Sequence, residues 1–232
     1  MHLPDGIINN QISIGFLAVS ASFLMVSFVK LRKSITKKVL RQRLALADGL
    51  SAESSLNQQT VITQQSRKKM ELMAMLGALI FALQMINFPI THGTSGHLIG
   101  GVLLAITLGP WAGIIVMSVI LMIQSLIFAD GGVLAFGANI FNMGIIACLG
   151  GFYFYKIGLR IKLPKLVAVA IVAWLSVMLA ALACSLQIGL SGTINLFLVV
   201  PAMLKVHALI GLGEAVITVM IIKILKLKLY EK

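Results

Sequence analysis

The sequence contains few charged residues, few acids and few cysteines. Only 11% of its 232 residues are charged, seven are Asp or Glu, and two are Cys. With 59% hydrophobic residues and a mean hydropathy of +1.02, the chain has too little polar surface to cover a water-soluble domain. Both cysteines, Cys148 and Cys184, lie in long apolar runs. Neither a disulfide framework nor a metal-thiolate site is therefore expected.

Two groups of catalytic motifs are also missing. The sequence has no G-x-x-x-x-G-K-[ST] motif, so the chain is not expected to hydrolyse ATP by P-loop chemistry. It also has no H-E-x-x-H motif and no nucleophile and base at a useful spacing, which disfavours an enzyme. An intramembrane metalloenzyme that uses His97, His207 and Glu214 is the weakest of the alternatives left open.

Long apolar runs predict an all-α integral membrane protein, with residues 1–232 in one transmembrane domain. Stretches of about 20 apolar residues are enough to cross a bilayer as helices. The segment 97–109 is apolar but short, and we expect a broken helix there that begins below the outer surface. Six longer spans are expected at 10–29, 70–88, 111–128, 134–155, 166–187 and 200–222.

The positive charges predict the orientation of these helices. Of 19 Lys and Arg residues, 18 lie within 30–69, 156–165 and 223–232. The positive-inside rule makes these regions cytoplasmic, which predicts about seven crossings, an outside N-terminus and a cytoplasmic C-terminus. The net charge of +12 then reflects topology and predicts no nucleic-acid partner. We expect a multi-pass protein of the cell's inner (plasma) membrane, in contact with the lipid bilayer.

The hydrophilic segment 31–69 is interpreted as a basic cytoplasmic loop. Its middle is rich in Ser, Gln and Thr, which favours a flexible linker. A helix at the membrane surface near residues 39–46 is an alternative for part of it. No basic region precedes the first span, so no cleavable signal peptide is expected.

The first six residues, MHLPDG, predict a site for a transition metal. The amine of Met1, the backbone nitrogen of His2 and its ring Nδ1 can close two fused chelate rings around one divalent ion. The bulky His2 should prevent removal of Met1, and Pro4 with the following turn residues stiffens the segment. Residues 1–9 are thus expected to form an extracellular metal-binding arm, with one position open for another imidazole. An ordinary frayed terminus is the alternative.

The other three histidines, His92, His97 and His207, fall on the same outer side of the predicted topology. His97 begins the short helix, with Thr94 or Ser95 as its cap, and would face a pocket that the arm can reach. A simple hydrogen bond to a neighbouring helix is the alternative for His97. His92 is a possible spare ligand.

Four further polar residues are possible accessory groups beside the ligands: His207, Glu214, Asn139 and Asn142. Glu214 lies seven residues after His207 on the same helix face, where it could accept from a histidine or pair with Lys205. A structural polar contact explains these residues equally well. Asn139 and Asn142 place amides in an otherwise apolar helix and are candidates for hydrogen bonds that orient ligands.

Together the motifs resemble the CbiM/NikM family, the substrate-capturing S components of energy-coupling factor (ECF) transporters for cobalt and nickel. The matching segments are MHLPDG at 1–6, GTSGHLIGG at 93–101, LGPWAG at 108–113, FADGGVLAFGANIFNMG at 128–144 and PAMLKVHALIGLGEAVIT at 201–218. The resemblance implies seven helices and a planar set of four nitrogens from Met1, His2 and His97 around Co²⁺ or Ni²⁺, with no cofactor. It also implies a transmembrane coupling (T) subunit, two cytoplasmic ATPases and a small CbiN/NikN-like membrane subunit.

The choice of substrate depends on finer features. These ligands do not separate cobalt from nickel, although LSGTINLFLVVPAML at 190–204 resembles the cobalt branch. An S component for an organic vitamin is an alternative in which Met1 and His2 would be dispensable. Three features depart from the family pattern: the long loop 31–69, Thr91-His92 in place of a common Pro-Gly pair, and Lys205 in place of a small or apolar residue.

Overall fold

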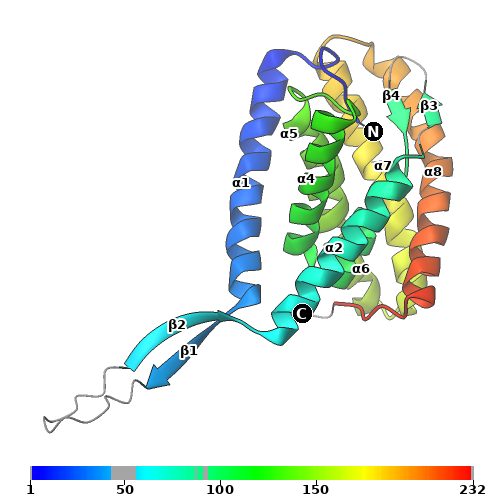
Figure 1. Cartoon of the computed structure of the whole chain (residues 1–232). Helices are drawn as coiled ribbons and strands as arrows, with labels where there is room; N and C mark the ends of the chain where they lie inside the picture. The colour runs from blue at the N-terminus through cyan, green and yellow to red at the C-terminus, as the bar shows by residue number, and fades with distance from the viewer. Residues whose placement is uncertain (1, 43–55, 87, 91–93, 231–232) are drawn as a thin grey trace, which may run out of the picture.

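The computed structural model describes residues 2–42, 56–86, 88–90 and 94–230. The chain forms a nearly all-helical bundle, from which one hairpin projects (Figure 1). The helices are α1 (Asn10–Ile35), α2 (Gln64–Gln84), α3 (Gly101–Leu108), α4 (Pro110–Ile127), α5 (Phe136–Asn139), the π-helix η1 (Ile140–Gly150), α6 (Gly151–Arg160), α7 (Lys165–Leu190) and α8 (Leu196–Ile224). The strands are β1 (Thr36–Gln42), β2 (Leu56–Ile62), β3 (Phe88–Ile90) and β4 (Thr94–Gly96).

The predicted membrane fold is confirmed in outline, and the chain is a multi-pass membrane protein. Within the described residues, five helices are long and apolar enough to cross a membrane: α1, α4, the continuous α5-η1-α6, α7 and α8. Helix α2 has 21 residues, but Arg67, Lys68, Lys69 and Glu71 occupy its beginning and shorten its apolar part. The total of seven crossings stays a prediction.

The short helix begins later than its predicted first residue, His97. Residues 94–96 form β4, paired with β3, and α3 begins only at Gly101. The predicted caps Thr94 and Ser95 are therefore wrong, because the cap position belongs to Gly100, whose φ of 74° is accessible to glycine. All eight residues of α3 are buried, so this interrupted stretch of backbone is enclosed by the protein as required at membrane depth.

The loop 31–69 contains more regular structure than predicted. Helix α1 continues to Ile35, and β1 and β2 then form an antiparallel hairpin in which Thr36 faces Ile62 and Gln42 faces Leu56. The alternative of a surface helix near 39–46 is therefore wrong for residues 39–42, and its remainder lies outside the described residues. Helix α2 begins after this hairpin, where the Thr63 hydroxyl accepts from Ser66 N–H.

The basic regions gather at one end of the bundle. In Figure 1, α1 ends, α2 begins, α6 ends, α7 begins and α8 ends at the lower end, where the C-terminus also lies. The arm that carries the N-terminus enters the bundle near the opposite end (Figure 1). This arrangement follows the pattern that the charges predicted, while the direction of the bundle in the membrane stays a prediction.

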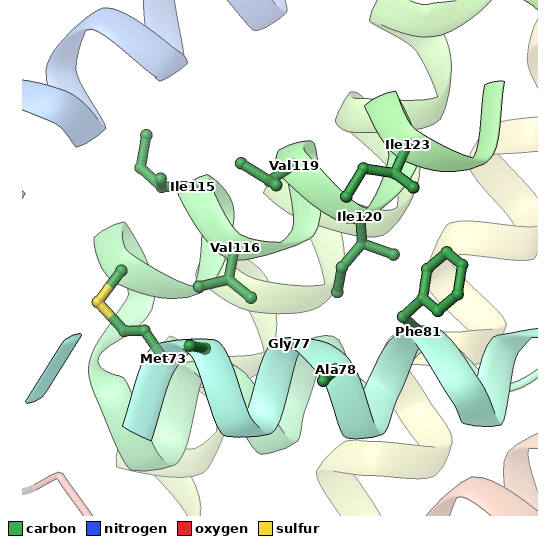
Figure 2. A pocket seen from close by; sticks show the side chains of 10 residues that line it. Met73, Gly77, Ala78, Phe81, Ile115, Val116, Val119, Ile120 and Ile123 are labelled. Carbon is green, nitrogen blue, oxygen red and sulfur yellow. The ribbon is translucent and has the colours of Figure 1, made fainter. Parts of the chain in front are cut away.

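An apolar groove of about 450 Å³ runs between α2 and α4 (Figure 2). Gly77 and Ala78 leave space on α2, and Val116, Val119 and Ile120 line the facing side of α4. No histidine is among the residues that line it. Apart from the Met73 thioether, the residues that line the groove offer no side-chain donor to a metal ion.

Candidate metal-binding site

The N-terminal arm is fixed inside the bundle by Asn139, at the end of α5. The Leu3 N–H donates to Asn139 Oδ1 over 2.8 Å, and Asn139 Nδ2 donates back to the Leu3 carbonyl over 3.1 Å. The Gly132 N–H donates to the same carbonyl over 2.8 Å. Leu3 itself is fully buried. Asn139, predicted as an accessory residue, thus holds the arm and makes these contacts to backbone rather than to a histidine ring.

Asp5 provides a second anchor for the arm. Its carboxylate accepts from the backbone N–H groups of Leu134 at 2.8 Å and of Val133 and Ala135 at 3.2 Å each. Consecutive N–H groups form a concave site for an anion, and the carboxylate occupies it here. Gly132 leaves the space, since a Cβ there would overlap Asp5. From the sequence, Asp5 was interpreted only as a turn residue. Because the chain contains only seven Asp and Glu residues, an acidic residue in the arm could have indicated a specific role.

The loop between α7 and α8 holds the outer part of the arm. Thr193 Oγ1 donates to the Ile7 carbonyl over 2.7 Å, and the Asn9 N–H donates to Ser191 Oγ over 2.8 Å. Asn9 then caps α1 by accepting from the Ile12 N–H. The arm is therefore attached at three places: Asn139, the loop before α5, and the loop between α7 and α8. These attachments determine the position of His2.

These anchors bring His2 into contact with His97. The two ring centroids are 4.3 Å apart with an interplanar angle of 39°, and the side chains are 2% and 0% exposed. His97 Nδ1 lies 2.7 Å from the Leu98 carbonyl, so this nitrogen carries the hydrogen and the lone pair is on Nε2. The structure thus joins the first residues of the chain to the segment before α3.

Asp130, in the loop before α5, lies next to His2. Its Oδ1 is 2.8 Å from His2 Nδ1, but the two atoms are not aligned as in a hydrogen bond. Burial lowers the pKa of His2, and the Asp130 carboxylate partly opposes this shift. The ring is consequently neutral near pH 7, which is the form that binds metals. Asp130 belongs to the segment 128–144 that resembles the family, but it was not predicted as a site residue.

Glu214 of α8 positions the segment that carries His97. Its Oε2 accepts from the Ile99 N–H over 2.8 Å, and its Oε1 accepts from the Gly100 N–H over 2.7 Å. The predicted partners of Glu214, a histidine or Lys205, are therefore wrong: its two oxygens bind backbone, and Lys205 is exposed. A carboxylate in the interior needs such donors, since an unpaired charge there is costly.

Two glutamines that the sequence analysis missed complete this support. Gln84 Nε2 donates to the Ile99 carbonyl over 2.6 Å, and Gln124 Nε2 donates to Gln84 Oε1 over 3.0 Å. Both glutamines are fully buried. The sequence feature that could have identified them is the one used for Asn139 and Asn142, a side-chain amide within an apolar run. Helices α2 and α8 thus bind the backbone next to His97, and α4 supports Gln84 through Gln124.

Asn142 has a different role from Asn139. Its amide and that of Gln187 exchange two hydrogen bonds, of 2.8 Å and 2.9 Å, which join η1 to α7. Both residues are buried. We assign Asn142 to helix packing, since its amide oxygen and nitrogen are both used by Gln187.

Replacing either partner of this amide pair by leucine is expected to destabilise the protein. Asn142→Leu or Gln187→Leu would leave a buried amide unpaired, at a cost of about 1–3 kcal/mol, whereas the double variant removes both amides and should recover part of the loss. Thermal unfolding of the four proteins in detergent measures the coupling. Additive losses in the double variant would contradict this assignment.

His207 lies on α8, and two other predicted residues cannot be placed. His207 is fully buried, and its Nδ1 lies 2.8 Å from the Met203 carbonyl. Met1 and His92 fall outside the described residues. Among the residues that are described, no group of three or more His, Cys, Asp or Glu side chains is arranged to hold a metal ion.

The chain is similar to known transport proteins. It is 36% identical over 220 residues to a putative fused nickel transport protein, NikMN, of Archaeoglobus fulgidus, covering 94% of this chain and 63% of that protein. It is 37% identical to a probable fused nickel transport protein, LarMN, of Lactiplantibacillus plantarum, covering 70% of this chain and 54% of the relative. The chain thus spans less than two thirds of the length of these two fused relatives.

A solved structure and a family model agree with these relatives. The crystal structure of a truncated transition metal transporter superposes with a TM-score of 0.81 at 33% identity, covering 97% of this chain and 98% of that one. The model of the CbiM family, described as the cobalt uptake substrate-specific transmembrane region, matches residues 50–229. This match covers more than half of the chain, and the chain therefore belongs to the CbiM family of cobalt uptake substrate-specific transmembrane regions.

Proposed function

We propose that this chain is the metal-capturing S component of an ECF-type importer for Co²⁺ or Ni²⁺. The observation that carries the proposal is the contact between two buried imidazoles, those of His2 and His97, at the end of an anchored arm. Burial keeps His2 neutral, and three anchors fix its position before any ion arrives. Such preorganisation favours binding because little order has to be gained with the ion.

The ligands we propose are the Met1 amine, the His2 backbone nitrogen, the His2 Nδ1 and a ring nitrogen of His97. Nitrogens bound to one ion lie within about 4 Å of each other, because each metal–nitrogen bond is about 2.0–2.1 Å long. The ring separation of 4.3 Å supports a shared ion. His2 Nδ1 has to turn away from Asp130 to bind, so the ion would replace this contact.

The same geometry favours an ion over an organic vitamin. Rings in contact at 4.3 Å leave room for an ion and not for a molecule of many atoms. Their donors are nitrogens, which suit nickel, cobalt and copper better than magnesium or calcium. Affinity rises from Co(II) through Ni(II) to Cu(II) in such sites, so selection among these metals depends on availability and on the rigidity of the arm.

The proposed partners follow from the resemblance and from the names of the relatives. ATP hydrolysis would take place on two cytoplasmic ATPases coupled through a T subunit, since this chain has no P-loop motif. The fused names of the two relatives support a small NikN-like membrane component as a further partner. In this assembly the chain is a transport subunit without enzymatic activity of its own.

A metal titration of the purified protein with its native N-terminus tests the proposal. We expect stoichiometric Ni(II) binding, a visible band typical of planar nickel, and release of protons from the amine and the amide. Because protons compete with the ion for these nitrogens, the apparent affinity should fall as the pH is lowered. Binding without proton release would contradict the chelate, and no binding of either Ni(II) or Co(II) would exclude the proposed substrate.

A further inference from the structure

His207 has a buried ring nitrogen that the proposed ligand set does not use. Its Nδ1 lies 2.8 Å from the Met203 carbonyl one turn earlier in α8, and a carbonyl can only accept. Nδ1 therefore carries the hydrogen, and Nε2 carries the lone pair. His207 is fully buried, and its Nε2 has no hydrogen-bond partner among the described residues. A fixed tautomer with the other nitrogen open is the usual state of a metal-binding imidazole.

His207 lies on the same helix, α8, that binds the segment carrying His97 through Glu214. Glu214, which binds Ile99 and Gly100, lies seven residues further on the same face of α8, about 10 Å along the axis at 1.5 Å per residue. Helix α8 also packs against β4, which directly precedes His97.

The backbone around His207 is held rigidly. Trp174 of α7 donates from its ring Nε1 to the Ala208 carbonyl over 3.1 Å, and its side chain packs on Gly211. Helices α7 and α8 form the most extensive helix contact in the described chain. His207 thus belongs to a helix that is held in place by α7, whereas His2 belongs to the N-terminal arm.

We propose that His207 is a transfer ligand, which binds the ion after the ion leaves the N-terminal chelate. This inference rests on the proposed function, since it concerns the same ion. A planar set of four nitrogens completes the coordination of Ni(II), so Nε2 has no place on the ion while that set is intact. Once the amine and amide nitrogens take up protons from water and leave the ion, Nε2 of His207 can bind the ion together with His97.

An N-terminal extension exposes this second mode of binding. A protein with four glycines before Met1 loses the chelate, because the new amine lies too far from the ring of His2, and we expect it to retain weak Co(II) binding through imidazoles. In this background His207→Asn should weaken Co(II) binding about tenfold or more, the range found when a metal site loses one supporting group. In the native background the same change should alter Co(II) affinity less than about twofold, because the intact set does not use Nε2.

The variants separate a ligand from a structural residue. The asparagine amide can still donate to the Met203 carbonyl, but it lacks the Nε2 lone pair. Thr218→Val, which alters another buried polar residue of α8, is the matched control and should have no effect in either background. Pulsed electron paramagnetic resonance of the extended protein loaded with Cu(II) should count one imidazole fewer in the His207→Asn variant.

Three outcomes would overturn the transfer ligand. They are an equal loss of affinity in both backgrounds, no loss in either, and no Co(II) binding by the extended protein. The proposed function fails in a different way: the native and extended proteins would then bind Co(II) equally, or the native protein would not bind it. The two proposals can therefore be rejected separately.

Discussion

Four extra glycines before Met1 are expected to weaken Ni(II) binding by about a hundredfold or more. Binding to a four-ligand site is worth about 10–16 kcal/mol, so one donor accounts for about 2.5–4 kcal/mol. A factor of ten in affinity corresponds to about 1.4 kcal/mol. The extension converts the Met1 amine into an amide and moves the charge of the terminus away from the chelate. Competition titrations of the native and extended proteins measure the difference.

The control for this experiment is four extra glycines after Lys232. Helix α8, the last helix of the described chain, ends at the opposite end of the bundle from the arm (Figure 1), so the control should bind Ni(II) as the native protein does. The extended protein should remain folded, because the anchors at Leu3, Asp5 and Asn9 are made by residues downstream of the change. Equal affinities of the native and N-terminally extended proteins would remove Met1 from the ligand set.

Glu214→Ala is expected to lower Ni(II) affinity about 10–100-fold although the carboxylate is not among the proposed ligands. Removal of a group that orients a metal ligand has this effect in other metal sites. The alanine leaves the Ile99 and Gly100 N–H groups without an acceptor in the protein interior, and each such loss costs about 1–3 kcal/mol. The segment that carries His97 should then lose its position. Ni(II) titration and thermal unfolding in detergent together measure both effects.

Two control variants on the same helix sharpen this test. Glu214→Gln keeps one acceptor oxygen, so its affinity should lie between those of the native protein and the alanine variant. Lys205→Ala should change neither affinity nor stability, because Lys205 is exposed and Glu214 is bound to backbone. Unchanged Ni(II) affinity in Glu214→Ala would show that the hydrogen bonds of Glu214 do not control the position of His97.

The errors in the sequence analysis share one physical cause. The start of α3 was misplaced because Ile99 and Gly100, which precede the helix, donate to the carboxylate of Glu214, more than a hundred residues away in sequence. Thr94 and Ser95 have good local capping propensity, but that propensity was overridden by a tertiary contact. The anchors made by Asp5 and Gln84 were missed for the same reason, because their partners are backbone groups in distant segments. The pattern of neighbouring residues in the sequence contains no information about hydrogen-bond partners in distant segments.

The sequence by itself determined the class of protein, the approximate position of the helices and the residues that can chelate an ion. Hydropathy and the placement of charge act along the chain, and MHLPDG contains its donors within two residues. Only the tertiary structure decided that His2 meets His97, that Asp5 and Asn139 hold the arm, and that Nε2 of His207 is left open. Those contacts depend on helix packing, which brings together groups far apart in the sequence and buries them where each needs a partner.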